Sequence, residues 1–334
     1  MKSLTYLINS LSRLEPGFAA VMLKDNQIVW RKCVGLADLN KKIPITPITN
    51  FRLASLSKQF TAMTVMILVQ RRKLNLEDKL TDFFSDYPAY GNQVTVRQLL
   101  SHTAGIPDHE KPLYKTIKSG DEPTMIDALE VLRNQPIPLF PPGSKYQYSD
   151  AGYVLLALII EKVSGLSYRK FLQRNIFSPL GMTGSDVLDQ TKSKIKNRAM
   201  GYKIIGKGFE VFDYDPLNYI VGDEGVYSSL EDMIEWSRAW EEEILVSRKT
   251  LTEAMTPAKL ANGDFGKAGF SWLTGKFNGD KIVYQDGSWV GFRNIILKIP
   301  AKKLTAVILS NRTDLDSEKQ RINMIMGLLP QSKL

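Results

Sequence analysis

The 334-residue chain is long enough to bury a large core, either as one domain or as two lobes around a cleft. Hydrophobic residues at 43% and charged residues at 24% are typical of a globular protein and exclude the disordered and fibrous classes. The net charge of +9 would suit an anionic partner, but the basic residues are scattered and their densest runs lack interleaved aromatic residues. We therefore expect a solvated basic surface and no nucleic-acid binding.

Two residue counts restrict the chemistry. Cys33 is the single cysteine, which excludes an intrachain disulfide and a thiolate-rich metal site. The two histidines are His102 and His109, so a His-rich zinc centre is not expected, and a Ser-His-Asp triad would have to use one of them.

The N-terminus shows no signal peptide, because polar residues interrupt its apolar run after residue 8. No apolar run approaches the length of a membrane span. We expect a soluble chain, cytoplasmic as given, or periplasmic or extracellular if a leader has been removed. The sequence leaves the oligomeric state open.

Strands are predicted near both ends of the chain, with helices between them. A short helix at residues 4–14 precedes strands at 17–23 and 28–34. The helix predicted from about residue 55 to 73 carries apolar side chains in nearly every direction, so we expect it to be buried. Further helices are predicted at 96–101, 124–134, 151–163 and 168–175, then strands at 269–273, 281–285, 292–299 and 304–310, and a last helix at 317–329.

This order predicts an α+β fold with an antiparallel sheet built from both ends of the chain and flanked by helices. Residues 1–75 and 206–334 would form the lobe that contains the sheet, and residues 76–205 an inserted, mostly helical lobe. A cleft between two lobes is a common place for an active site, and we expect it there.

Ser55 and Lys58 form an S-x-x-K motif at the start of the long buried helix. Residues i and i+3 share a helix face, so the lysine amine can reach the serine hydroxyl and take its proton. Desolvation by the apolar helix would lower the pKa of the lysine, and the helix N-terminus would stabilise an oxyanion. The same spacing occurs at 167–170 and 193–196, and the alternative for Ser55 is an ordinary N-cap.

The run Thr-Asn-Phe-Arg-Leu-Ala-Ser-Leu-Ser-Lys-Gln-Phe-Thr-Ala at 49–62 closely resembles the nucleophile segment of class C β-lactamases, D-alanyl-D-alanine carboxypeptidases and related family VIII esterases. Residues 99–107 and 225–233 are similar to structural signatures of the same family, in the same order. The resemblance implies a β-lactamase/transpeptidase-like fold. It also implies that His102 is structural, which argues against a histidine-based triad.

The segment Tyr148-Ser149-Asp150 is similar to the Tyr-x-Asn element of that family. By this resemblance Tyr148 is the second proton-transfer group, and Asp150 contributes to substrate binding. The alternative is a packed tyrosine with Asp150 capping a helix that begins at Ala151. An ionised Asp in place of Asn accepts hydrogen bonds but donates none, and it would raise the pKa of Lys58 and oppose its role as a base.

The segment Gln285-Asp286-Gly287-Ser288 corresponds to the family element that carries Lys or His, any residue, and Gly. By this resemblance Gln285, Gly287 and Arg293 contribute to substrate binding. Gln285 can hydrogen-bond but lacks the cation that binds a substrate carboxylate, and Arg293 is a candidate replacement or a strand-surface arginine. Gly287 would let the backbone approach the acyl oxygen. By resemblance, the backbone N–H groups of Ser55 and Ser288 form the oxyanion hole.

Together these features predict a serine hydrolase that forms an acyl-enzyme on Ser55, with no metal and no organic cofactor. We rank a promiscuous, β-lactamase-related esterase first, a D-amino-acid peptidase or D,D-carboxypeptidase second, and efficient β-lactam hydrolysis third. The expected partner is a small ester, β-lactam or D-amino-acid peptide. The alternative of another class is a catalytically inactive relative that binds cell-wall fragments or acts as a scaffold.

Overall fold

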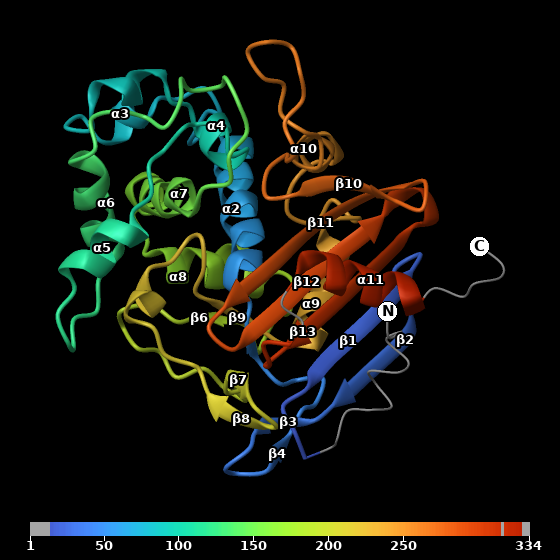
Figure 1. The fold of residues 1–334 in the computed structure, drawn as a ribbon. Coiled ribbons are helices and arrows are strands. Elements are labelled where there is room, and N and C mark those ends of the chain that lie inside the picture. Colours follow the sequence, from blue (N-terminus) through green and yellow to red (C-terminus); the bar gives the residue numbers. More distant parts are fainter. Residues whose placement is uncertain (1–13, 315–316, 329–334) are drawn as a thin grey trace.

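The structure is a computed structural model that describes residues 14–314 and 317–328 (Figure 1). Its strands are β1 (Phe18–Lys24), β2 (Gln27–Val34), β3 (Leu36–Asp38), β4 (Ile43–Pro44), β5 (Phe51–Arg52), β6 (Asp186–Val187), β7 (Tyr202–Ile205), β8 (Gly208–Val211), β9 (Val226–Ser228), β10 (Leu273–Phe277), β11 (Asp280–Trp289), β12 (Phe292–Ile299) and β13 (Leu304–Ser310).

The α-helices are α2 (Lys58–Gln70), α3 (Leu80–Phe83), α4 (Val96–Leu100), α5 (Glu110–Thr116), α6 (Met125–Arg133), α7 (Asp150–Ser164), α8 (Tyr168–Leu172), α9 (Leu230–Ala239), α10 (Arg248–Ala254) and α11 (Glu318–Leu328). Short turns of tighter or wider helix are η1 (Ala54–Ser57), η2 (Ala89–Gln93), η3 (Gln173–Phe177), η4 (Pro216–Tyr219) and η5 (Pro300–Lys302).

The main sheet has six strands in the order β10-β11-β12-β13-β1-β2, and all its neighbours are antiparallel. Strands from the two ends of the chain meet where β1 pairs with β13, with Phe18 opposite Ser310. Figure 1 shows these strands, blue and red, side by side. The predicted α+β fold, with an antiparallel sheet assembled from both ends of the chain, is confirmed.

Side chains of successive strand residues point to opposite faces, and both faces of this sheet are covered. Phe18, Ala20 and Met22 of β1 pack in one core together with Ile322 and Ile325 of α11. The alternate residues of β1 belong to the larger core, which also contains side chains of α9 and α2. The central strands are therefore apolar on both faces, which explains their nearly continuous hydrophobic runs.

Helix α2 lies between the sheet and the helices that gather on the left of Figure 1. Every residue from Lys58 to Leu68 is buried, which confirms the predicted burial of this helix. All elements from α3 to η3 are helical, as the two-lobe interpretation expects, but the division into lobes stays a prediction. In the described part of the chain, no single helix has the length and composition of a membrane span; α7 with α8–η3 meets those criteria only as a pair bent by 73°.

Most predicted elements are found within a few residues of their expected positions, with two corrections. The strand expected at 269–273 is wrong, since β10 begins at Leu273. The preceding residues are held against the end of α10, where the Phe270 N–H donates to the carbonyl of Ala254 at 2.7 Å. The long helix begins as η1, continues as α2 and ends at Gln70. The helix expected at 4–14 lies almost entirely outside the described residues.

Gly287 lies where strand β11 passes directly over the segment that precedes α2. A Cβ atom at this position would lie 2.1 Å from the carbonyl oxygen of Leu53 and 3.0 Å from the backbone N of Leu56. Both contacts are with backbone atoms, which cannot rotate away as a side chain can. Glycine is thus required for packing between the sheet and η1, in addition to any approach of an acyl oxygen.

We expect Gly287→Ala to lower the free energy of unfolding by about 1–3 kcal/mol, because the backbone must shift to accept the new methyl group. Denaturant unfolding followed by circular dichroism measures this change. Gly275→Ala on the neighbouring strand β10 is the matched control, since its Cβ would meet ordinary contacts at 3.5 Å or more. Equal stability of the two variants would contradict the packing argument.

Candidate active site

Ser55 is held in place by backbone contacts from the sheet. The Leu53 N–H donates to the carbonyl of Val226 at 2.8 Å, beside the short pairing of β5 with β9. The buried amide of Asn294, on β12, donates to the carbonyls of Arg52 at 2.9 Å and Leu53 at 3.2 Å. These bonds fix the two residues before the η1 turn, and sequence reasoning did not identify Asn294.

Ala54, directly before Ser55, has a φ of +54°. This left-handed conformation is unfavourable for a residue with a Cβ and costs on the order of 1 kcal/mol or more. Such strain persists only where the surrounding contacts impose it, and it often marks a functional site. Here it turns the chain so that Ser55, half-buried, enters η1 one turn before Lys58.

Lys58 is completely buried, and its ammonium group has three acceptors. Nζ lies 3.2 Å from Ser55 Oγ, 2.6 Å from Asp150 Oδ1 and 3.1 Å from the carbonyl oxygen of Asp223. Burial by itself would lower the pKa of Lys58, but the carboxylate of Asp150, with contributions from Tyr148 and Asp223, raises this pKa well above its ordinary value. In the structure as it stands, Lys58 is therefore charged.

Asp150 is the first residue of α7, which excludes the alternative in which it caps this helix. Ser149 is the N-cap, because its Oγ accepts the N–H of Gly152 at 3.1 Å. The carboxylate of Asp150 is thereby free to bind Lys58. Burial raises the pKa of Asp150, but the ion pair with Lys58 outweighs burial and brings this pKa below its ordinary value. Asp150 and Lys58 thus form a charged pair beside Ser55.

Tyr148 lies next to this pair, with Lys58 Nζ 5.1 Å from the centroid of its ring. The residue keeps 36% of its surface exposed and lines the pocket beside Ser55. Burial raises the pKa of the Tyr148 phenol and outweighs the opposing effects of the Lys58 charge and of hydrogen bonds to Ser55 and Lys58. The phenol is accordingly neutral in this arrangement.

His102 supports Tyr148 from behind. Its ring stacks on the Tyr148 ring, with centroids 4.4 Å apart and an angle of 22°. Its Nδ1 accepts the backbone N–H of Ser149 at 3.1 Å. Burial and the charge of Lys58 lower the pKa of His102 to about 3, so the imidazole stays neutral. This placement agrees with the structural role that the sequence implied for His102.

A pocket of about 520 Å³ opens beside Ser55. Tyr148 contributes to its wall from the helical part of the chain, and β10 and β11 contribute from the sheet. The exposed residue Ser288 also lies on this wall. An oxyanion hole that uses its backbone N–H requires Ser288 to lie beside the pocket. The lining residues are Ser55, Tyr146, Tyr148, Lys267, Leu273, Thr274, Tyr284, Asp286, Ser288 and Glu318.

Gln285 and Arg293 do not line this pocket. Gln285 is 1% exposed, and its amide donates to the backbone carbonyls of Ser55 at 3.3 Å and Asp286 at 3.1 Å. Arg293 donates to the carbonyls of Val290 and Phe292, beyond the end of β11. The expectation that Gln285 and Arg293 bind substrate is therefore not supported, because backbone carbonyls already engage both side chains.

Around Lys58 the site carries several acidic groups that the motifs did not reveal. The carbonyl of Asp223 is the third acceptor of Lys58, and Glu224 faces the buried Arg52 at 3.8 Å. Both residues come from the loop before β9, directly ahead of the recognised segment at 225–233. Burial raises the pKa of Asp223 to about 7 and that of Glu224 well above its ordinary value. Only the folded chain brings this loop to α2.

Comparison with known proteins agrees with this geometry. The family model described as Beta-lactamase matches residues 12–329. Penicillin-binding protein 4* of Bacillus subtilis is 32% identical over 308 residues, which cover 88% of this chain and 67% of that protein. A D-aminopeptidase of Gluconobacter oxydans is 27% identical over 311 residues, which cover 89% of this chain and 56% of that protein. The chain thus spans about two thirds and just over half of these relatives.

The solved structure of a penicillin-binding protein from Bacillus halodurans has a TM-score of 0.82 and 26% sequence identity, and the match covers 98% of this chain and all of that one. The predicted β-lactamase/transpeptidase-like fold is confirmed. The match to the family model over nearly the whole chain, together with the Bacillus subtilis relative, identifies the family. The chain belongs to the β-lactamase family of serine hydrolases.

Proposed function

We propose that the chain hydrolyses small acyl substrates through a covalent acyl-enzyme on Ser55. The observation that carries this proposal is the 3.2 Å contact between Lys58 Nζ and Ser55 Oγ at the edge of an open pocket. In this mechanism Ser55 Oγ attacks the substrate carbonyl, and its proton passes to Lys58. Tyr148 gives its proton to the leaving group and regains one from Lys58, and water then hydrolyses the acyl-enzyme.

Asp150 sets a condition on this mechanism. A charged Lys58 cannot accept a proton, so acylation starts from the fraction of molecules in which Lys58 has lost one. The ion pair with Asp150 makes this fraction small. The backbone N–H groups of Ser55 and Ser288 are proposed to stabilise the oxyanion of the tetrahedral intermediate; each such donor is worth about 10²–10³ in rate.

The charges at the site support neutral esters as the preferred substrates. Asp150 takes the position where an Asn would donate to a substrate amide, and Gln285 is turned toward the backbone of Ser55. In the described part of the pocket wall, Lys267 is the one cation, and Asp286 and Glu318 are acidic. Arg321 pairs with Asp286 and offsets its charge. Because Gln285 stands where the family carries a cation, a substrate carboxylate, such as that of a β-lactam, would lack that charged partner.

A D-amino-acid peptidase is the second candidate. The acidic side chain of Glu318 on the pocket wall suits a substrate with a free ammonium group, and one relative is a D-aminopeptidase. A catalytically inactive, binding-only relative is the alternative of another class. The contact between Ser55 and Lys58 and the position of Tyr148 argue against it, because a binding protein has no need of them.

We expect a fluorophosphonate probe to add one covalent group to the wild-type chain and none to Ser55→Ala, since the probe reacts with an activated serine. Intact-mass spectrometry measures the adduct. Ser57→Ala, two residues away, is the control and should still react. An adduct that survives in Ser55→Ala would show that another residue is the nucleophile, and no adduct on the wild type would support the binding-only alternative.

Asp150→Asn is expected to change substrate preference in opposite directions for two charged substrates. Relative to neutral p-nitrophenyl acetate, kcat/KM should rise roughly tenfold for anionic nitrocefin and fall for D-alanine p-nitroanilide, because one negative charge near the pocket is worth about 1–2 kcal/mol. A change in the pKa of Lys58 would alter kcat/KM for all three substrates by the same factor. It therefore cancels when each value is divided by the value for p-nitrophenyl acetate. Unchanged ratios in steady-state kinetics would contradict the electrostatic argument.

The contribution of His102 to the free energy of unfolding is expected to fall as the pH decreases from about 6.5 toward 3, whereas Asp223 and Glu110, whose pKa values burial raises, contribute with the opposite sign in the upper part of this range. In this range the unfolded chain takes up a proton at His102, whereas the buried, neutral imidazole does not until its pKa of about 3. The slope from His102 alone is about 1.4 kcal/mol per pH unit. The difference in free energy of unfolding between the wild type and His102→Gln, measured by denaturant titration at several pH values, isolates this contribution from those of His109, Asp223 and Glu110. A difference that does not change with pH would contradict the prediction.

A further inference from the structure

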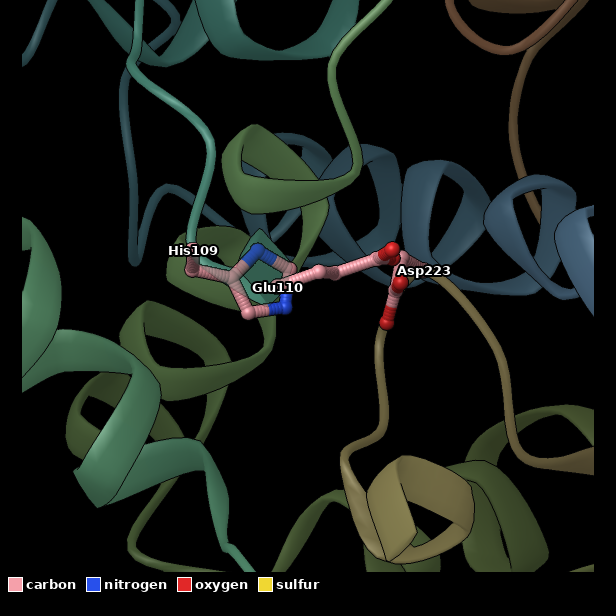
Figure 2. A group of neighbouring side chains, drawn as sticks. All are labelled: His109, Glu110 and Asp223. Atoms are coloured by element: carbon pink, nitrogen blue, oxygen red, sulfur yellow. The ribbon is translucent and has the colours of Figure 1, made fainter. Parts of the chain in front are cut away.

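His109, Glu110 and Asp223 form a side-chain cluster that the proposed mechanism does not use. One potential ligand atom from each residue lies within 4.8 Å of the other two. Figure 2 shows the edge of the His109 ring and the two carboxylates turned toward one another. His109 and Glu110 lie at the start of α5, whereas Asp223 comes from the loop before β9. Asp223 lies more than 100 positions after them in the sequence, so the three residues meet only in the folded chain.

Two members of this cluster are almost fully buried, and each carries one buried side-chain atom that has no hydrogen-bond partner in the described part of the chain. His109 is 1% exposed and Asp223 is 4% exposed. Among the described residues, neither Nδ1 of His109 nor Oδ1 of Asp223 has a hydrogen-bond partner. Burial of a carboxylate oxygen without a partner is costly, and proteins normally compensate it with a hydrogen bond, an ion pair or a metal ion.

The cations nearby are already engaged by other groups. The ammonium of Lys58 is 2.6 Å from Asp150 and contacts Asp223 through its backbone carbonyl, and Arg52 faces Glu224. Within the described ranges, no ion pair involves the side chain of Glu110 or Asp223.

We propose that His109, Glu110 and Asp223 bind one divalent transition-metal cation, with Zn²⁺ as the best fit. Imidazole nitrogen and carboxylate oxygen are both ligands of Zn²⁺, and three protein ligands leave a fourth position for water. The imidazole nitrogen favours Zn²⁺ over Mg²⁺ or Ca²⁺, which prefer oxygen ligands. A bound ion would supply the counter-charge that the two carboxylates lack.

The surrounding backbone holds these ligands in a fixed arrangement. The carboxylate of Asp108 accepts the Glu110 N–H at 2.9 Å and fixes the start of α5. Next to Asp223, Gly222 has a φ of +108°, and a Cβ there would lie 2.5 Å from the carbonyl oxygen of Tyr153 on α7. The loop is therefore pressed against α7. Ligands fixed in this way lose little conformational entropy when a cation binds.

The site lies beside the proposed catalytic pair but is not needed for the acyl-transfer steps. Asp223 connects the two, since its carbonyl accepts from Lys58 and its side chain belongs to the cluster. Direct binding of the metal therefore tests the inference independently of hydrolysis. Failure of Ser55 as the nucleophile would leave the cation site intact, and failure of the cation site would leave the proposed hydrolysis intact.

Isothermal titration of the untagged, EDTA-treated full-length chain with Zn²⁺ tests this proposal. We expect one ion per chain in the wild type and affinity at least about 100-fold weaker in Glu110→Gln and Asp223→Asn, each of which removes one ligand charge. Glu110 is half-buried and Gln has nearly the same shape, so this variant should fold; circular dichroism checks it.

Two controls distinguish this site from non-specific binding. Asp121→Asn removes an exposed carboxylate outside the cluster and should bind Zn²⁺ as the wild type does. His102→Gln removes the other histidine and should also retain binding, whereas His109→Gln should lose it. Absence of binding by the wild type, or equal affinity in wild type and Glu110→Gln, would overturn the proposal.

Discussion

The buried ammonium group of Lys58 connects the main parts of the site. A charge removed from water needs partners, and Lys58 has three: the hydroxyl of Ser55, the carboxylate of Asp150 and the carbonyl of Asp223. These groups come from η1, from the first residue of α7 and from the loop before β9. Loss of any one would leave a buried charge with fewer partners, so this one charge constrains three segments that are distant in sequence.

The sheet supplies the second constraint, because it fixes the serine that Lys58 meets. β11 approaches η1 so closely that Gly287 has no room for a Cβ, and Asn294 of β12 holds the carbonyls before the turn. The left-handed conformation of Ala54 is maintained by these contacts. Strain of this kind, imposed by rigid strands, positions Ser55 without a mobile loop.

The same residue that completes the ion pair also limits the chemistry. Asp150 stabilises the charged form of Lys58, and it adds to a group of acidic side chains that includes Asp223, Glu224 and Glu110. Acidic side chains gathered around a lysine-dependent nucleophile favour the approach of cations, whether on a substrate or as a metal ion. The proposed substrate preference and the proposed metal site therefore share one electrostatic cause, although they involve different residues.

The sequence by itself determined the elements and motifs whose signals are local. Alternating and continuous apolar runs predicted the strands and the buried α2, and the motifs at Ser55, Tyr148 and Gly287 indicated the family. Local patterns also misplaced one strand, because contacts of Phe270 with the end of α10 override its apolar run. Only the tertiary structure decided what Asp150, Gln285 and Asp223 contact, and it brought His109 and Glu110 to Asp223. Such contacts join residues tens to hundreds of positions apart, and charge pairing and burial depend on that three-dimensional proximity, which no local pattern encodes.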